Sequence, residues 1–157
     1  RIDNQIKKST MRKLFYLLIA TLVLVSCENG SKKKTGENQE EEIQSNRIEV
    51  LYFHGAQRCI TCRAIETNTV ALLDNLYAKE KAEGKIIYKV IDISKKENEA
   101  ITDKYEVTWS SLFVNGWKDG KENVNNMTEF SFSNAKNTPD KFKEGIKSKI
   151  DELLKQL

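Results

Sequence analysis

The sequence of 157 residues is poor in several residue types that many functional sites need. It contains one histidine, three cysteines, one proline and seven glycines. A single histidine cannot form the HExxH pair of a zinc protease, which excludes that class. The sequence also has no glycine-rich phosphate loop and no internal repeat, so neither a P-loop nucleotide site nor a repeat architecture is expected.

A transmembrane helix is absent too, because the longest apolar run is too short for one. The run covers residues 14–25, whereas a helix that spans a bilayer needs about 20 residues. Arg12 and Lys13 come directly before the run, and Met11 comes before them. This order is typical of a secretory signal peptide. We therefore predict a signal peptide over residues 1–26, with the true start at Met11.

The apolar run ends in LVSC, residues 24–27, which resembles the bacterial lipobox. The resemblance implies that Cys27 is lipidated and becomes the mature N-terminus. Several acyl chains anchor a protein stably to a membrane. We expect a lipoprotein of the bacterial cell envelope that faces the periplasm or the exterior, where disulfides persist. After Cys27, the segment up to residue 46 is polar and charged, and it is expected to be a flexible tether.

The positive net charge of +3 comes from the N-terminal segment. Residues 1–26 hold five of the 26 basic residues and one of the 23 acidic ones, which leaves 21 basic and 22 acidic residues. The remaining chain therefore has a net charge of −1. Because a nucleic-acid-binding domain ordinarily keeps a basic surface, nucleic acid is not an expected partner.

Residues 47–157 alternate between strand-like and helix-like patterns. The expected strands are 47–55, 85–94, 110–117 and a short one within 122–125. The expected helices run from Cys62 to Gly84, over 95–105 with Ser94 as N-cap, and over 140–157, while 127–139 is expected to be a loop-like insertion. The order β-α-β-α-β-β-α predicts an α/β domain with a mixed four-stranded sheet flanked by helices.

The motif CITC, residues 59–62, falls between the first expected strand and the first long helix. A helix N-terminus offers unpaired N–H groups and a partial positive charge, which both stabilise a thiolate. Arg58 and Arg63 place further positive charge on either side of the motif. We predict that Cys59, at the helix cap, is the attacking thiolate and that Cys62, one turn inward, resolves the mixed disulfide.

This order of elements around CITC resembles the thioredoxin-like fold over residues 47–157. The segment YEVTWSSLFVNGWKDGKE, residues 105–122, is similar to the thioredoxin segment that leads into the active-site loop and hairpin. The resemblance implies a three-layer sandwich and a thiol–disulfide oxidoreductase that acts on partner proteins through Cys59 and Cys62, with no cofactor besides this redox-active disulfide. It also implies a reducing direction, with a membrane thiol-conducting reductase as a possible partner. A monomer is expected.

Two departures from the thioredoxin pattern lie close to the cysteines. Ile60 and Thr61 replace the Gly-Pro that usually separates them, and this dipeptide tunes the reduction potential. Phe53 stands where thioredoxins have a buried aspartate. Any base that assists the resolving cysteine is therefore another group, for which His54, Glu66 and water are the candidates.

A third departure concerns the loop that faces the cysteines. Thioredoxins have a cis-proline there, but the only proline of this chain is Pro139. Ser110 and Ser111 align with this loop, and Ser111 takes the proline position. A cis bond before a non-proline residue costs about 3 kcal/mol, so we expect a trans peptide or a rearranged loop. Trp109 is expected in the core or on the rim of the site.

A CxxC motif can also attach haem, bind a metal or form a structural disulfide. Haem attachment needs CxxCH, but Arg63 follows Cys62, and tetrahedral zinc needs more ligands than two cysteines and His54 supply. A carrier site for copper or another thiophilic metal, which thiolates suit, is an alternative function. A non-catalytic thioredoxin-like scaffold with a structural disulfide is another. We expect His54 to pack or hydrogen-bond, so no residue is assigned as a metal ligand.

Overall fold

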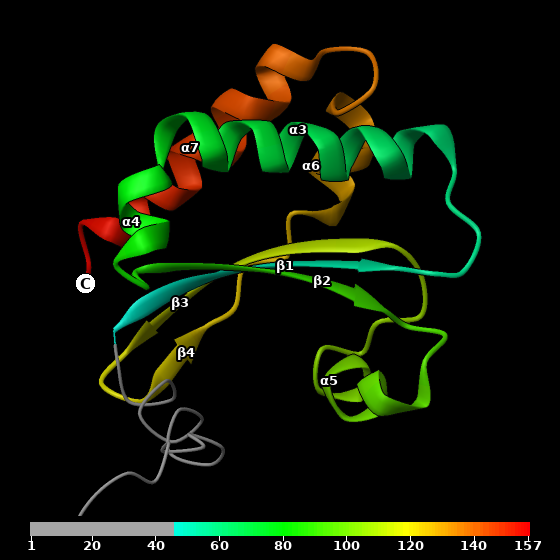
Figure 1. Cartoon of the computed structure of the whole chain (residues 1–157), viewed down its shortest axis with the longest axis horizontal. Helices are drawn as coiled ribbons and strands as arrows, with labels where there is room; N and C mark the ends of the chain where they lie inside the picture. The colour runs from blue at the N-terminus through cyan, green and yellow to red at the C-terminus, as the bar shows by residue number, and fades with distance from the viewer. Residues whose placement is uncertain (1–45) are drawn as a thin grey trace, which may run out of the picture. The chain divides into compact units, whose positions relative to one another are not determined.

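A four-stranded mixed sheet forms the centre of the computed structural model, which describes residues 46–157 (Figure 1). In spatial order the strands are β2 (Ile86–Asp92), β1 (Arg47–His54), β3 (Ser111–Lys118) and β4 (Lys121–Asn123). β1 runs parallel to β2 and antiparallel to β3, and β3 forms a hairpin with β4. The α/β class and the mixed four-stranded sheet that the sequence predicts are confirmed.

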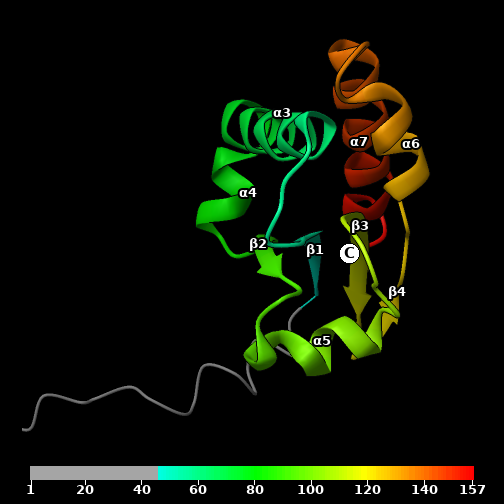
Figure 2. The same ribbon diagram turned by 90° about the vertical axis from the view of Figure 1, so that its right-hand side faces the viewer.

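Helices cover both faces of this sheet (Figures 1 and 2). One face carries α3 (Ile60–Leu76), α4 (Ala78–Ala82), α6 (Thr128–Asn134) and α7 (Pro139–Leu154). The other face carries α5 (Glu99–Lys104), which follows a 3-10 turn at Lys96–Asn98. Three layers with the strand order β2-β1-β3-β4 make this a thioredoxin-like fold, as the sequence predicts.

The central strand β1 is buried on both faces, which explains its nearly continuous apolar sequence. Side chains such as Val50 and Tyr52 belong to the larger core beneath α3 and α7. Leu51 and Phe53 belong to the smaller core beside α5. The ring of Phe53 packs edge-on against that of Phe113, with centroids 5.7 Å apart. Phe53 therefore fills a core position on the face of the sheet that is opposite α3.

Residues 127–139 differ from the prediction, because the segment contains the helix α6 instead of a loop. The Oδ1 atom of Asn126 accepts a hydrogen bond from the Thr128 N–H over 2.9 Å, which supports the first turn. Ser131 and Ala135 are buried against the rest of the domain. Polar residues such as serine and asparagine disfavour a helix locally, and burial of one helix face overrides that preference.

The first long helix is shorter than predicted, since α3 ends at Leu76 and α4 begins after a break at Tyr77. Tyr77 is buried, and its hydroxyl donates a hydrogen bond to Asp151 of α7 over 2.6 Å. Val70 and Leu76, which the helical pattern places on the buried face, are exposed. The chain bends at Tyr77 to bring its ring and hydroxyl against α7, and this long-range contact has no local signal.

Ser94 does not cap a helix as predicted. Its N–H and its hydroxyl both donate to the Oδ1 atom of Asp92, over 3.0 and 2.7 Å. The 3-10 turn begins at Lys96, with Lys95 as its N-cap. The aspartate at the end of β2 thus organises the turn locally, and the helix starts later.

The predicted signal peptide, the lipidation site Cys27 and nearly all of the tether lie outside the described residues. Within residues 46–157, none of the helices has the length and apolarity that crossing a bilayer requires.

Candidate functional site

Cys59 and Cys62 form a disulfide at the start of α3, with their Cα atoms 5.0 Å apart. Cys59 is the N-cap residue, and its extended backbone ends where the helix begins at Ile60. The Cys62 N–H donates a hydrogen bond to the Cys59 sulfur over 3.0 Å, which is the capping interaction that a serine or aspartate side chain usually makes. The first intrahelical bond runs from the Arg63 N–H to the Cys59 carbonyl over 3.0 Å. The predicted placement of the pair at a helix cap is confirmed.

The two cysteines differ sharply in their access to solvent. Cys59 is exposed, whereas Cys62 keeps 5% of its surface accessible. The neighbouring side chain of Ile60 is 72% exposed, and Thr61 is half-buried. A bulky reagent or protein therefore meets the sulfur of Cys59 first, and Cys62 is reached only from within the site.

The electrostatic surroundings of Cys59 favour a negative sulfur. The side chain lies at the N-terminal end of a 17-residue helix whose first turn contains no acidic residue. The partial positive charge of that helix end and its free N–H groups stabilise an anion at the cap. On reduction, the Cys59 sulfur would remain the acceptor of the Cys62 N–H, so the thiolate would gain a charge-assisted hydrogen bond.

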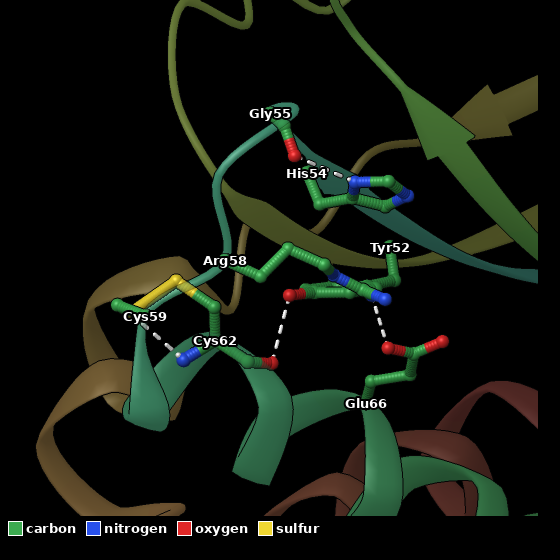
Figure 3. The surroundings of a disulfide bond; sticks show 7 residues. All are labelled: Tyr52, His54, Gly55, Arg58, Cys59, Cys62 and Glu66. Carbon is green, nitrogen blue, oxygen red and sulfur yellow. Dashed lines mark hydrogen bonds and ion pairs between the residues drawn. A yellow bond between two sulfur atoms is a disulfide. The ribbon is translucent and has the colours of Figure 1, made fainter.

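A polar cluster lies on the inner side of the cysteines (Figure 3). The buried Tyr52 of β1 donates its hydroxyl to the Cys62 carbonyl over 2.8 Å. The Arg58 guanidinium lies 5.6 Å from the centre of the Tyr52 ring and forms an ion pair with Glu66 of α3. Figure 3 shows the Arg58 side chain extending away from the disulfide toward Tyr52 and Glu66. Its charge is therefore balanced by Glu66, while Arg63 is exposed.

The surroundings of the Tyr52 hydroxyl shift its pKa. Burial raises the pKa of Tyr52, and hydrogen bonding with Arg58 and with Ser110 opposes that rise. The net shift is upward from an already high value, so the hydroxyl keeps its proton at neutral pH and acts as a donor.

The two serines Ser110 and Ser111 are both buried, and Ser111 lies at the end of the sheet toward which β1 runs before the cysteines. Ser111 begins β3 and pairs with Phe53 of β1, and its hydroxyl donates to the Trp109 carbonyl over 3.0 Å. All peptide bonds of the described residues are trans. The expectation of a trans peptide at Ser110–Ser111 is therefore confirmed.

The two side chains considered as bases for Cys62 have other partners. His54 places Nδ1 2.9 Å from the Gly55 carbonyl, to which it donates in the matching tautomer. Glu66 holds Arg58. No hydrogen bond joins either side chain to Cys62 within residues 46–157. In the same part of the chain, no group of three or more histidine, cysteine, aspartate and glutamate side chains is placed to hold a metal ion.

Two features of the site were missed by reasoning from the sequence. One is Tyr52, whose signal is a hydroxyl within the apolar stretch of β1 between Glu49 and His54. The other is the aromatic pair of Trp109 and Phe132, with centroids 5.1 Å apart. Trp109 is 58% exposed, so it lies on the rim and not in the core.

Comparisons with known proteins find similarity at the level of structure. No family model matches the sequence, and no curated protein matches it. Solved structures similar to this chain include Trxlp from Edwardsiella tarda EIB202, with 11% identity over 71% of this chain and 93% of that one and a TM-score of 0.46. Oxidised mitochondrial thioredoxin 3 from Saccharomyces cerevisiae is 20% identical over 69% and 84%, with a TM-score of 0.41. A malarial protein is 16% identical over 59% and 100%, with a TM-score of 0.37.

Tyr52 and Tyr88 provide a matched test of the hydrogen bond to the Cys62 carbonyl. They lie on the neighbouring strands β1 and β2, but the buried Tyr88 hydroxyl has no hydrogen-bond partner among the described residues. Tyr52→Phe should lower the free energy of unfolding of the oxidised protein by about 1 kcal/mol, because it leaves the carbonyl with one bond fewer. Tyr88→Phe should change it by less than about 0.5 kcal/mol or raise it, because it removes an unpaired polar group.

Urea unfolding of the three oxidised proteins, with a common m-value, measures both changes. Equal losses in the two variants, or a larger loss in Tyr88→Phe, would show that the Tyr52 hydroxyl does not support the first turn of α3.

Proposed function

We propose that this chain is a thiol–disulfide oxidoreductase that exchanges disulfides with partner proteins through Cys59 and Cys62. The observation that carries the proposal is the asymmetry of the pair. An exposed sulfur caps the N-terminus of a long helix, and a buried sulfur lies one turn behind it, already bonded to the first. This arrangement provides an accessible nucleophile together with an internal group that can release the product.

In the reducing direction, the Cys59 thiolate attacks one sulfur of a disulfide in the partner protein. That disulfide breaks, its other sulfur leaves as a thiolate that takes a proton from water, and a mixed disulfide forms. Cys62 then loses its proton and attacks the Cys59 sulfur. The Cys59–Cys62 disulfide forms again, and the second partner sulfur leaves. Two electrons pass from the dithiol of this chain to the partner, and no other cofactor takes part.

The cellular setting is part of the proposal. Lipidation of Cys27 would hold the chain as a monomer on a membrane of the bacterial cell envelope, facing the periplasm or the exterior. The lipobox-like LVSC and the signal-peptide pattern before it support this setting. A membrane thiol-conducting reductase would supply the electrons.

Incorporation of radioactive palmitate into the chain tests the lipid anchor. The label should be lost in Cys27→Ser, because the acceptor of the lipid is missing.

The two cysteines should behave differently when each is changed. Cys62→Ser should accumulate mixed disulfides with partner proteins, because the resolving sulfur is missing. Cys59→Ser should accumulate none and should abolish insulin reduction, because the buried Cys62 cannot reach a partner. Non-reducing gels of envelope fractions, with reduction as the control, measure the adducts. Full insulin reduction by Cys59→Ser would contradict the assignment of the nucleophile.

The reduction potential of the pair decides the direction of electron flow. If the chain is a reductase, the reduction potential of its cysteine pair should lie near that of thioredoxin, about −270 mV. Equilibration with redox buffers of known potential, followed by alkylation of the free thiols, measures the midpoint. A midpoint near −120 mV, which is typical of a strong oxidant, would reverse the direction and leave the exchange function in place.

A further inference from the structure

A cavity of about 690 Å³ lies between the loop that precedes β3, the first residues of β3 and the helix α6. The thiol chemistry described above makes no use of it. Its lining includes the aromatic side chains of Trp109 and Phe132 and the carboxylates of Glu106 and Glu129. No lysine or arginine of the described residues contributes to the lining. The cavity is therefore aromatic and acidic.

The cavity is joined to the cysteine pair by a short series of contacts. Ser111, which lines the cavity, pairs across the sheet with Phe53 of β1, the strand that leads into the cysteine pair. Tyr52 of the same strand donates to the Cys62 carbonyl over 2.8 Å. On the other wall, α6 packs beside α3, and the Asn68 side chain donates to the Ala135 carbonyl at the end of α6 over 2.9 Å. The cavity therefore lies at the end of the sheet toward which β1 runs before the cysteines, on the side where α6 packs against α3.

The aromatic wall of the cavity contains one ring that is largely exposed. Trp109 is 58% exposed, and its ring is stacked at a tilt of 34° on that of Phe132. An exposed aromatic side chain beside a cavity indicates a binding surface when charged groups line the same cavity. The faces of indole and phenyl rings attract cations, and arginine in particular stacks on them.

The acidic groups of the cavity are available to a ligand. Neither Glu106 nor Glu129 has an ion-pair partner within residues 46–157. Glu106 also has a backbone φ of 53°, directly after the C-terminus of α5. Glycine fits this left-handed position without the steric cost that glutamate incurs. The sequence therefore keeps a carboxylate at the cavity where a glycine would fold more easily.

We infer that the cavity binds a lysine or arginine side chain of the polypeptide whose sulfur reacts with Cys59. This inference rests on the proposed function and names the class of substrate that the site prefers. The cation would lie against the faces of Trp109 and Phe132 and pair with Glu106 and Glu129, which an apolar side chain would leave unpaired.

The test uses two peptides that differ only at one position near a single cysteine. One carries arginine there, and the other carries citrulline, which has nearly the same shape but no charge. Each cysteine is linked to thionitrobenzoate, whose release reports the attack of Cys59 on the peptide sulfur. The full chain with Cys62→Ser, solubilised in detergent, limits the reaction to this step. In it the Cys59–peptide disulfide forms, the peptide–thionitrobenzoate bond breaks, and the leaving thiolate is coloured.

The arginine peptide should react about five- to tenfold faster than the citrulline peptide, and the advantage should shrink as salt is added. Each variant is scored by its own ratio of the two rates, so changes in the reactivity of Cys59 cancel. Glu106→Gly with Glu129→Gln should bring the ratio close to one. Glu144→Gln, which removes the same charge from an exposed position on α7, should keep the ratio of the parent.

Each outcome decides the inference. Equal rates for the two peptides in the parent chain would overturn it, as would a ratio that survives the paired glutamate changes. Because Glu106→Gly relieves the left-handed strain, a melting temperature at or above that of the parent is expected for this variant and excludes unfolding as the cause of a lost ratio. Glu129→Gln alone should lower the ratio part of the way. No release from either peptide would overturn the proposed function itself.

Discussion

The hydrogen bond from the Cys62 N–H to the Cys59 sulfur is the interaction on which the rest of the site depends. It makes the reactive sulfur the cap of a 17-residue helix, so the group that must carry negative charge lies where the helix is most positive. The same turn buries Cys62 and leaves Cys59 open. The same helix turn thus makes Cys59 the sulfur that meets the partner protein, buries Cys62 and stabilises negative charge at the Cys59 sulfur.

The fold keeps this turn in place from the inside. The central strand β1 is buried on both faces, and its Tyr52 holds the Cys62 carbonyl, while Arg58 and Glu66 pair beside it. Phe53, which departs from the thioredoxin pattern in the sequence, fills the smaller core on the face of the sheet opposite α3.

Much of the fold and of the cysteine site was predictable, because the sequence signals for them are local. β1 contains the apolar stretch VLYF, residues 50–53, a few residues before CITC, and the turn between β3 and β4 contains Asp119 and Gly120 with positive φ. The helix α6 was not predictable, because polar residues such as Ser131 become buried only when α6 packs on the domain. The hydrogen bond from Tyr52 to the Cys62 carbonyl crosses the turn between β1 and α3, so the periodicity of neither element reveals it. The predictions on residues 1–45 lie outside the described part.

The pH dependence of Cys59 alkylation in the reduced protein tests the central claim most directly. The rate of carboxamidomethylation of Cys59 follows the fraction of thiolate, and Cys62→Ser removes the second sulfur as a complication. If the helix cap stabilises the thiolate, the rate should be half-maximal well below pH 8.5, about the value of an ordinary cysteine. The same protein unfolded in urea should return to that ordinary value. A half-maximal rate near pH 8.5 or above in the folded protein would contradict the account.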